Sequence, residues 1–193
     1  MEALAWIQST QPTEPPSDVY CQTRDIVQAR VESVRLTLLD NGWDEATAAL
    51  IVAVLGELTS NAFDHNIGQW PDIPGCWFEM SIEKNNVSVT IADRGQGVRS
   101  SLERVRPGID DHEAIRIAFT EHITGRAPEK RGNGLKFVLN ALNEFPALQF
   151  NYQSGTAKFL FNGKSNPTAA AFTIVNQQTP VRGVIATINI QRL

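Results

Sequence analysis

Apolar residues recur at helical spacing in two consecutive stretches of the N-terminal half. The first covers residues 23–40 and is followed by Asn41-Gly42, a pair that commonly ends a helix. The second follows Asp44, which suits an N-cap, and its apolar pattern covers residues 46–63. The pattern therefore predicts two helices in succession, joined by a short turn.

Alternating apolar and polar positions follow the second helix. Residues 77–83 and 87–92 alternate with period two around a short polar turn, which predicts a hairpin. Helical spacing returns at residues 111–122 and 135–143. Four further alternating runs cover residues 148–153, 157–161, 170–175 and 184–190. This order predicts an α+β fold, a two-layer sandwich in which a mixed, mainly antiparallel sheet carries helices on one face.

The length of 193 residues suits one domain with a full core, and we expect it to cover residues 19–193. Residues 9–17 are polar and rich in proline, so residues 1–18 are predicted to form a flexible N-terminal arm. Residues 163–182 are longer than a simple strand connection requires. They are expected to hold an extra edge strand or a surface for a partner.

Composition excludes several classes of function. The formal charge is −4, so the chain has no overall basic field for nucleic acid or an anionic membrane. No secretory signal is recognised, and no stretch approaches the roughly 20 apolar residues that cross a bilayer. Cys21 and Cys76 lack the spacing of a metal site and are too few for a disulfide framework. We therefore expect a cytoplasmic protein in which both cysteines are small core residues.

The segment ELTSNAFDH, residues 57–65, places polar groups along one face of the second helix. Glu57 and Asn61 are four residues apart and share that face, while apolar residues occupy the opposite face. A carboxylate can act as a general base, and an amide oxygen can ligate Mg²⁺. On this helix alone, a solvated face explains the pattern equally well.

Two glycine motifs follow. DRGQGV, residues 93–98, comes directly after a predicted strand, and its two glycines allow a sharp turn and a close approach to a ligand. RGNGL, residues 131–135, opens a predicted helix, where free N–H groups and the helix dipole attract phosphate. A tight turn and an ordinary loop-to-helix junction are the simpler explanations of each motif alone.

Taken in order, the three motifs resemble the N box and the two glycine boxes of the GHKL ATPase superfamily, which has the Bergerat ATP-binding fold. The resemblance extends over about residues 46–141. It implies ATP and Mg²⁺ as ligands. It also implies a lid, residues 98–131, that closes over the nucleotide.

The resemblance implies a role for each matching residue. Glu57 would be the general base, Asn61 would bind Mg²⁺, and Asp93 would accept a hydrogen bond from the adenine amine. His65 matches a histidine often found at the end of this helix, for which a structural role is favoured. The residues implied to contact ATP are Asn61, Asp93, Gly95, Gly97, Val98, Arg131, Gly132, Asn133, Gly134 and Leu135.

The chain departs from the family pattern at two places. Asp64 stands where histidine kinases often carry lysine, which weakens the likeness to that branch. The last strand begins Gly183-Val184 where many relatives have Gly-Thr, and Thr187 is a candidate substitute for the missing threonine.

Within the superfamily that it resembles, the chain is most similar to the small anti-sigma-factor type of serine-protein kinase, because its single-domain size, its acidic composition and the lack of a membrane segment disfavour the other branches. Such a protein transfers the γ-phosphate of ATP to Ser or Thr of a regulatory partner protein, itself of the anti-sigma or anti-anti-sigma kind. The alternatives are an ATPase that drives partner exchange and a nucleotide-gated binding module with little turnover. No contact with nucleic acid or membrane is expected, and a homodimer is a further expectation from the resemblance.

Overall fold

The computed structural model describes residues 1–121, 134–163 and 172–192. Its helices are α1 (Ala3–Gln8), α2 (Arg24–Asp40), α3 (Glu45–Asp64), α4 (Gly97–Leu102), α5 (Asp111–Thr120) and α6 (Gly134–Leu142). Its strands are β1 (Tyr20–Cys21), β2 (Cys76–Glu83), β3 (Asn86–Asp93), β4 (Leu148–Asn162) and β5 (Phe172–Gln191). They form a sheet in the order β1-β2-β3-β5-β4, in which every described pairing is antiparallel. The predicted α+β class is therefore confirmed.

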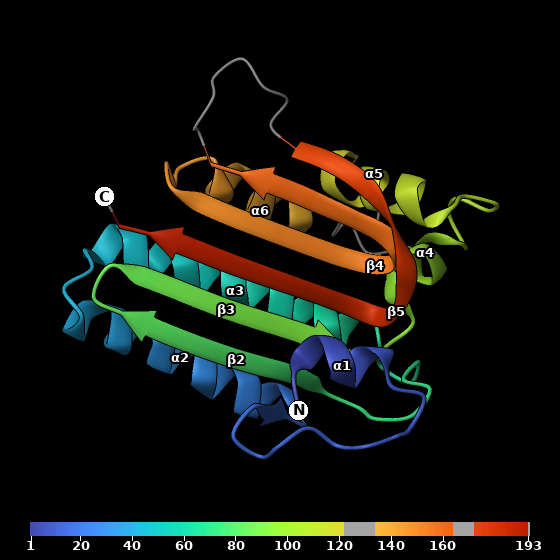
Figure 1. Ribbon diagram of the computed structural model, residues 1–193, viewed down its shortest axis with the longest axis horizontal. Helices are drawn as coiled ribbons and strands as arrows, with labels where there is room; N and C mark the ends of the chain where they lie inside the picture. Colours follow the sequence, from blue (N-terminus) through green and yellow to red (C-terminus); the bar gives the residue numbers. More distant parts are fainter. Residues whose placement is uncertain (122–133, 164–171, 193) are drawn as a thin grey trace.

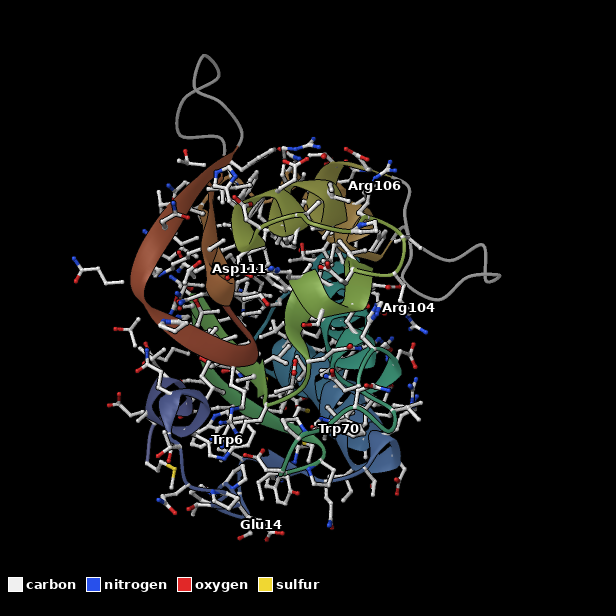
Figure 2. All side chains as sticks on the ribbon, turned by 90° about the vertical axis from the view of Figure 1, so that its right-hand side faces the viewer. Trp6, Glu14, Trp70, Arg104, Arg106 and Asp111 are labelled. Carbon is white, nitrogen blue, oxygen red and sulfur yellow. The ribbon has the colours of Figure 1, made fainter. Side chains whose placement is uncertain are left out.

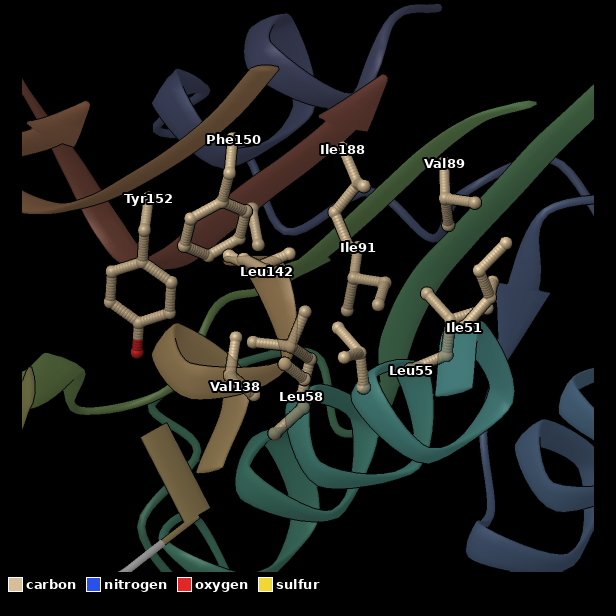
Figure 3. Close-up of a cluster of buried hydrophobic side chains, with 14 of the residues drawn as sticks. Ile51, Leu55, Leu58, Val89, Ile91, Val138, Leu142, Phe150, Tyr152 and Ile188 are labelled. Atoms are coloured by element: carbon tan, nitrogen blue, oxygen red, sulfur yellow. The ribbon is translucent and has the colours of Figure 1, made fainter. Parts of the chain in front are cut away.

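The main core lies between the sheet and the helices α2, α3 and α6 (Figures 1 and 3). Val87, Val89 and Ile91 are alternate residues of β3 and belong to the same buried cluster as Leu55 and Leu58 of α3. Figure 3 shows Val89 and Ile91 on the side of β3 that faces α3. These side chains are all buried, and removing their apolar surface from water is the main favourable contribution to stability. Asp93 ends the same alternating series and therefore faces the helices as well.

Helix α3 begins as the sequence predicts. The Asp44 side chain accepts a hydrogen bond from the backbone N–H of Thr47 at 2.9 Å, which satisfies one free donor of the first turn. In the part of the chain that the structure describes, α3 is the one helix long and apolar enough to cross a membrane. Its apolar stripe is used by the core, so length and composition alone do not make it a membrane span.

The four predicted C-terminal runs form two long strands instead of four short ones. Gly155 and Gly183 have positive φ, +58° and +70°, and lie inside β4 and β5, where the pairing register shifts. These glycines bend the strands without ending them. Residues 172–182, expected to hold an extra edge strand or partner surface, belong to β5, while residues 164–171 lie outside the described part of the chain.

The predicted lid, residues 98–131, begins with packed helices. Its described part contains α4 and α5, and α5 is packed into the core through Ile115 and Phe119. The Phe119 ring stacks on Phe159 of β4 with 4.0 Å between ring centroids. Any movement of α5 away from β4 would therefore open this core. Residues 122–131 of the predicted lid are outside the described residues.

The predicted N-terminal arm contains a packed helix, and helices therefore cover both faces of the sheet. Helix α1 lies on the face opposite α2 and α3 (Figures 1 and 2). Trp6 is fully buried there, 6.1 Å from Trp77 between ring centroids, and Ile185 belongs to the same cluster. The proline-rich residues 9–17 lead the chain back from this face to β1, so they are a connection and not the root of a free arm.

Arg94 fastens α1 to the turn after β3. Its side chain is completely buried and forms a bidentate ion pair with Asp72, with Nη2–Oδ2 at 2.6 Å and Nε–Oδ1 at 3.1 Å. It also donates to the carbonyl oxygens of Trp6 and Ser9. The nearby guanidinium lowers the pKa of Asp72. A buried cation paired in this way resists the loss of any partner.

We expect Trp6→Ala to lower the free energy of unfolding by about 3–5 kcal/mol, because it leaves a large cavity in the second cluster. Leu4→Ala on the same helix is the matched control, since Leu4 is 45% exposed and should change stability by less than about 0.5 kcal/mol. Urea unfolding of both variants measures the difference. Equal stabilities would mean that α1 is not docked in solution.

Candidate functional site

Glu57 and Asn61 of α3 meet the start of α6. A Cβ added at Gly134 would lie 2.6 Å from Glu57 Oε2 and 3.8 Å from Asn61 Nδ2. The glycine therefore leaves room for the Glu57 carboxylate beside the first backbone groups of α6. Two motifs that are more than 70 residues apart are brought together here. Leu135, which is also predicted to contact ATP, is partly buried and packs against the core.

Three predicted ATP-contacting residues, Arg131, Gly132 and Asn133, lie outside the described residues. The second glycine motif is thus represented by its last two positions only.

Asp93 lies at the end of β3 and is 4% exposed. The Asn66 side chain donates to its Oδ1 at 3.0 Å, and the backbone N–H of Gly95 donates to the same oxygen at 2.8 Å. Burial disfavours the charged carboxylate and raises the pKa of Asp93 to about 7, although these two donors oppose the shift. Perturbed carboxylates of this kind are typical of functional sites.

Asn66 is a site residue that lies outside the three motifs recognised in the sequence. It is 3% exposed, and its Nδ2 donates to the Ala62 carbonyl at 2.8 Å as well as to Asp93. Its Oδ1 accepts from the backbone N–H of Gln96 at 3.0 Å. The amide thus joins the end of α3 to the turn after β3. Its partners in that turn are 27 and 30 residues away in the sequence, so spacing alone gives no signal for it.

The glycines of DRGQGV are required by the protein's own side chains. A Cβ on Gly95 would lie 2.0 Å from Asn66 Oδ1, so this glycine makes the space that Asn66 fills. Gly97 has φ +76°, a left-handed conformation, and a Cβ there would lie 2.9 Å from Ser154 Oγ. Val98 is buried, and its N–H donates to Ser154 Oγ at 3.0 Å. These contacts within the protein fix the shape of the turn without a ligand.

Gly183 packs directly against Asp93. A Cβ added to it would lie 2.2 Å from the Asp93 carbonyl oxygen and 2.6 Å from Oδ1. The Ser154 hydroxyl donates to the Gly183 carbonyl at 3.0 Å, which links this bend to the turn at Gly97. The strand bend, the carboxylate and the glycine turn therefore form one packed unit.

One row of residues crosses the whole sheet at the level of Asp93. In strand order the row consists of Cys21, Cys76, Asp93, Val184 and Ser154. Side chains in such a row share one face, because paired residues of neighbouring strands point the same way. Both cysteines are free and buried, as expected of small core residues.

Thr187 does not replace the missing threonine at position 184. It is the register partner of Thr90, three residues before Asp93, and therefore points to the opposite face of the sheet. There its hydroxyl accepts a hydrogen bond from Asn151 Nδ2 at 3.1 Å. The prediction for Thr187 was wrong because it ignored the alternation of side chains along β5.

The two residues at the end of α3, Asp64 and His65, take part in packing contacts. Asp64 forms an ion pair with Arg24 of α2, whose guanidinium also lies 5.9 Å from the centre of the Phe63 ring. The His65 carbonyl accepts a hydrogen bond from the Gln96 side chain. These contacts hold α3 against α2 on one side and against the glycine turn on the other.

A groove of about 410 Å³ opens beside Glu57 between α2, α3 and α6. It is lined by Gln28, Val31, Glu32, Val52, Ala53, Gly56, Glu57, Thr59, Ser60 and Phe137. Phe137 is 39% exposed at its edge. Glu57 therefore borders both the start of α6 and an open groove.

A scan of protein-family models and a search of curated proteins found no match to this chain. Among solved structures, it is similar to the B-subunit of DNA gyrase from Myxococcus xanthus, with 15% sequence identity and a TM-score of 0.37. The match covers 85% of this chain and 43% of the gyrase chain. The chain thus spans less than half the length of that structure.

Gly183→Ala should destabilise the protein more than Gly68→Ala. Both glycines have φ +70°, so alanine at either costs about 1–2 kcal/mol of backbone strain. No atom lies within 4 Å of a Cβ at Gly68, whereas a Cβ at Gly183 collides with Asp93, which should add about 1–3 kcal/mol. Urea unfolding gives the difference, and equal effects would show that the packing at Asp93 relaxes freely.

Stability should depend on pH through Asp93. Its native pKa of about 7 lies above the ordinary 3.8, so between these values the native state holds a proton that the unfolded state releases. The free energy of unfolding should therefore fall as pH rises from about 4 to 7, by about 4 kcal/mol from this group, and then level off. The measurement is the stability difference between the wild type and Asp93→Asn at pH 5 to 8. A difference that does not change with pH would contradict the raised pKa.

Proposed function

We propose that this chain is an ATP-binding regulatory protein of the GHKL type that phosphorylates Ser or Thr of a partner protein. The observation that carries the proposal is the assembly around α3. At one position Glu57 and Asn61 face the start of α6, and at the end of the helix Asn66 holds Asp93 in the glycine turn. A nucleotide lying along α3 would place its phosphates near α6 and its base near Asp93.

Asp93 fits recognition of adenine. Among the described residues, both hydrogen bonds to its carboxylate use Oδ1, which leaves Oδ2 for the amine of a base. The residues in the same row of the sheet are mostly apolar or small. They would contact the flat faces of the base, and the Asp93 carboxylate would supply the specific hydrogen bond.

The residues near Gly134 fit a polyphosphate with Mg²⁺. Helix α6 presents its first N–H groups and the positive end of its dipole, and the Asn61 amide, whose oxygen would ligate Mg²⁺, lies beside them. Mg²⁺ commonly takes only one or two protein ligands and completes its shell with phosphate oxygens and water. When bound, it would neutralise charge on the phosphates.

Glu57 would act on the incoming nucleophile. Its carboxylate would accept the proton of a Ser or Thr hydroxyl as the hydroxyl oxygen bonds to the γ-phosphorus and the bond to the ADP oxygen breaks. The groove beside Glu57 is partly lined by apolar residues such as Val31, Val52 and Phe137. Such a groove suits a partner's side chain better than water alone, which supports protein phosphorylation over hydrolysis.

Mg·ATP should raise the melting temperature of the purified protein. At a concentration about 100-fold above Kd, binding adds about 2.7 kcal/mol, which corresponds to about 5–10 °C for a chain of this size. Glu57→Gln should keep this shift but lose transfer of radiolabel from γ-labelled ATP to a co-purified protein. Glu45→Gln on the same helix is the matched control, because Glu45 pairs with Arg35 at the far end of α3.

The outcomes separate the possible functions. No thermal shift would refute nucleotide binding, and undiminished transfer in Glu57→Gln would remove Glu57 from the mechanism. Release of free phosphate without labelled protein would indicate an ATPase instead. Binding with neither product would indicate a nucleotide-gated module.

A further inference from the structure

We propose that Asn66 is a positioning residue that fixes which oxygen of Asp93 faces the nucleotide base, so that the choice between adenine and a 6-oxopurine depends on it. This inference rests on the proposed nucleotide site. It concerns a residue outside the three motifs that predicted that site.

The hydrogen bonds of Asn66 define the orientation of its amide. Nδ2 has two acceptors, the Ala62 carbonyl at 2.8 Å and Asp93 Oδ1 at 3.0 Å. Oδ1 has one donor, the N–H of Gln96 at 3.0 Å. A flipped amide would set an NH₂ group against the Gln96 N–H and an oxygen against two acceptors. Asn66 therefore directs its N–H donor, and not its amide oxygen, toward Asp93.

This donor and the backbone N–H of Gly95 together confine any proton on Asp93 to one oxygen. Oδ1 already accepts from Asn66 and from the Gly95 N–H, so a proton on Oδ1 would face two donors. Protonation therefore takes place at Oδ2, the oxygen that would face the base in the proposed site. The ionised form offers an acceptor to the base, whereas the protonated form offers an O–H donor.

The two forms select different bases. Adenine carries an amine at C6, which donates and matches ionised Asp93. A 6-oxopurine carries a carbonyl at C6, which accepts and matches protonated Asp93. A mismatch leaves a buried polar group without a partner, which is strongly rejected in such sites.

Asn66 shares this task with the backbone N–H of Gly95, which donates to the same oxygen. Val184 is the register partner of Asp93 on β5 and has no polar group to offer. Gly95 lacks a Cβ at the point where the Asn66 amide sits, so the amide and the turn are shaped to each other. The Asn66 side chain is thus held both by the end of α3 and by the turn after β3.

Two titratable groups near Asp93, Cys76 and Tyr152, have raised pKa values and stay neutral where Asp93 changes charge. Cys76 of β2 is directly opposite Asp93, and its hydrogen bond with Cys21 together with burial raises its pKa. Tyr152 of β4 also has a raised pKa because of burial. Arg94, the next residue in the chain, is bound to Asp72 on the other face of the sheet. The native pKa of Asp93, about 7, therefore places its ionisation within the range of ordinary binding experiments.

The test is the affinity of the full chain for Mg·ATP and for the magnesium complex of inosine triphosphate, from pH 6 to 8.5. For the wild type, ATP should bind more tightly as pH rises, by up to tenfold per unit below pH 7, and inosine triphosphate more weakly. In Asn66→Ala, the carboxylate loses one donor, so the midpoint should move up by about 0.5–1 pH unit. The preference for ATP at pH 7.5 should fall severalfold.

Asn41→Ala is the matched control. Asn41 follows α2 as Asn66 follows α3, and its Nδ2 also donates to the carbonyl four residues before it, at 2.9 Å, but it does not touch the site. This variant should keep the wild-type midpoint and preference. If Asn66→Ala does not fold, Asn66→Ser retains a donor in a smaller side chain and should give an intermediate midpoint.

An unchanged midpoint and base preference in Asn66→Ala or Asn66→Ser would overturn this inference, as would wild-type affinities that do not vary with pH. Wild-type protein that binds neither nucleotide at pH 8 would instead overturn the proposed function.

Discussion

Burial of the Asp93 carboxylate is the constraint on which the rest of the site depends. A carboxylate removed from water is costly unless it is paired or hydrogen-bonded, and around Asp93 the described contacts are two neutral N–H donors on one oxygen. The neighbouring glycines leave space for the Asn66 donor and for the close approach of the backbone to Asp93. Gly95 has no Cβ where Asn66 sits, and Gly183 has none where it passes over Asp93.

The turn after β3 serves both faces of the sheet, because successive residues of a strand point in opposite directions. Asp93 faces α3 and the candidate site, while Arg94 faces α1 and binds Asp72 and the Trp6 carbonyl. Because Asp93 and Arg94 are joined by one peptide bond, displacement of either side chain would disturb the contacts of the other. The N-terminal helix is therefore a structural support of the site, although it lies on the far face of the sheet.

The sequence predicts those features that depend on local pattern. Helix α3 has a long apolar stripe and an N-cap, so its bounds and the shared face of Glu57 and Asn61 follow from spacing. Helix α1 has six residues, too few for periodicity to distinguish it from a loop, and it is stable because Trp6 is buried by distant residues. The role of Asn66 could not be predicted from local pattern either, since it depends on a turn about 30 residues away in the sequence.

The glycines and the carboxylate of DRGQGV differ as evidence for a ligand. Gly95 and Gly97 are required by contacts with Asn66 and Ser154, so any protein with this turn would need them whether or not it bound a nucleotide. Asp93 is different, because an apolar residue of similar size at this buried position would avoid the cost of burying a charge. A residue that lowers stability and still organises its surroundings is best explained by a function that needs it. The carboxylate, and not the glycines around it, is therefore the stronger evidence that this turn binds a ligand.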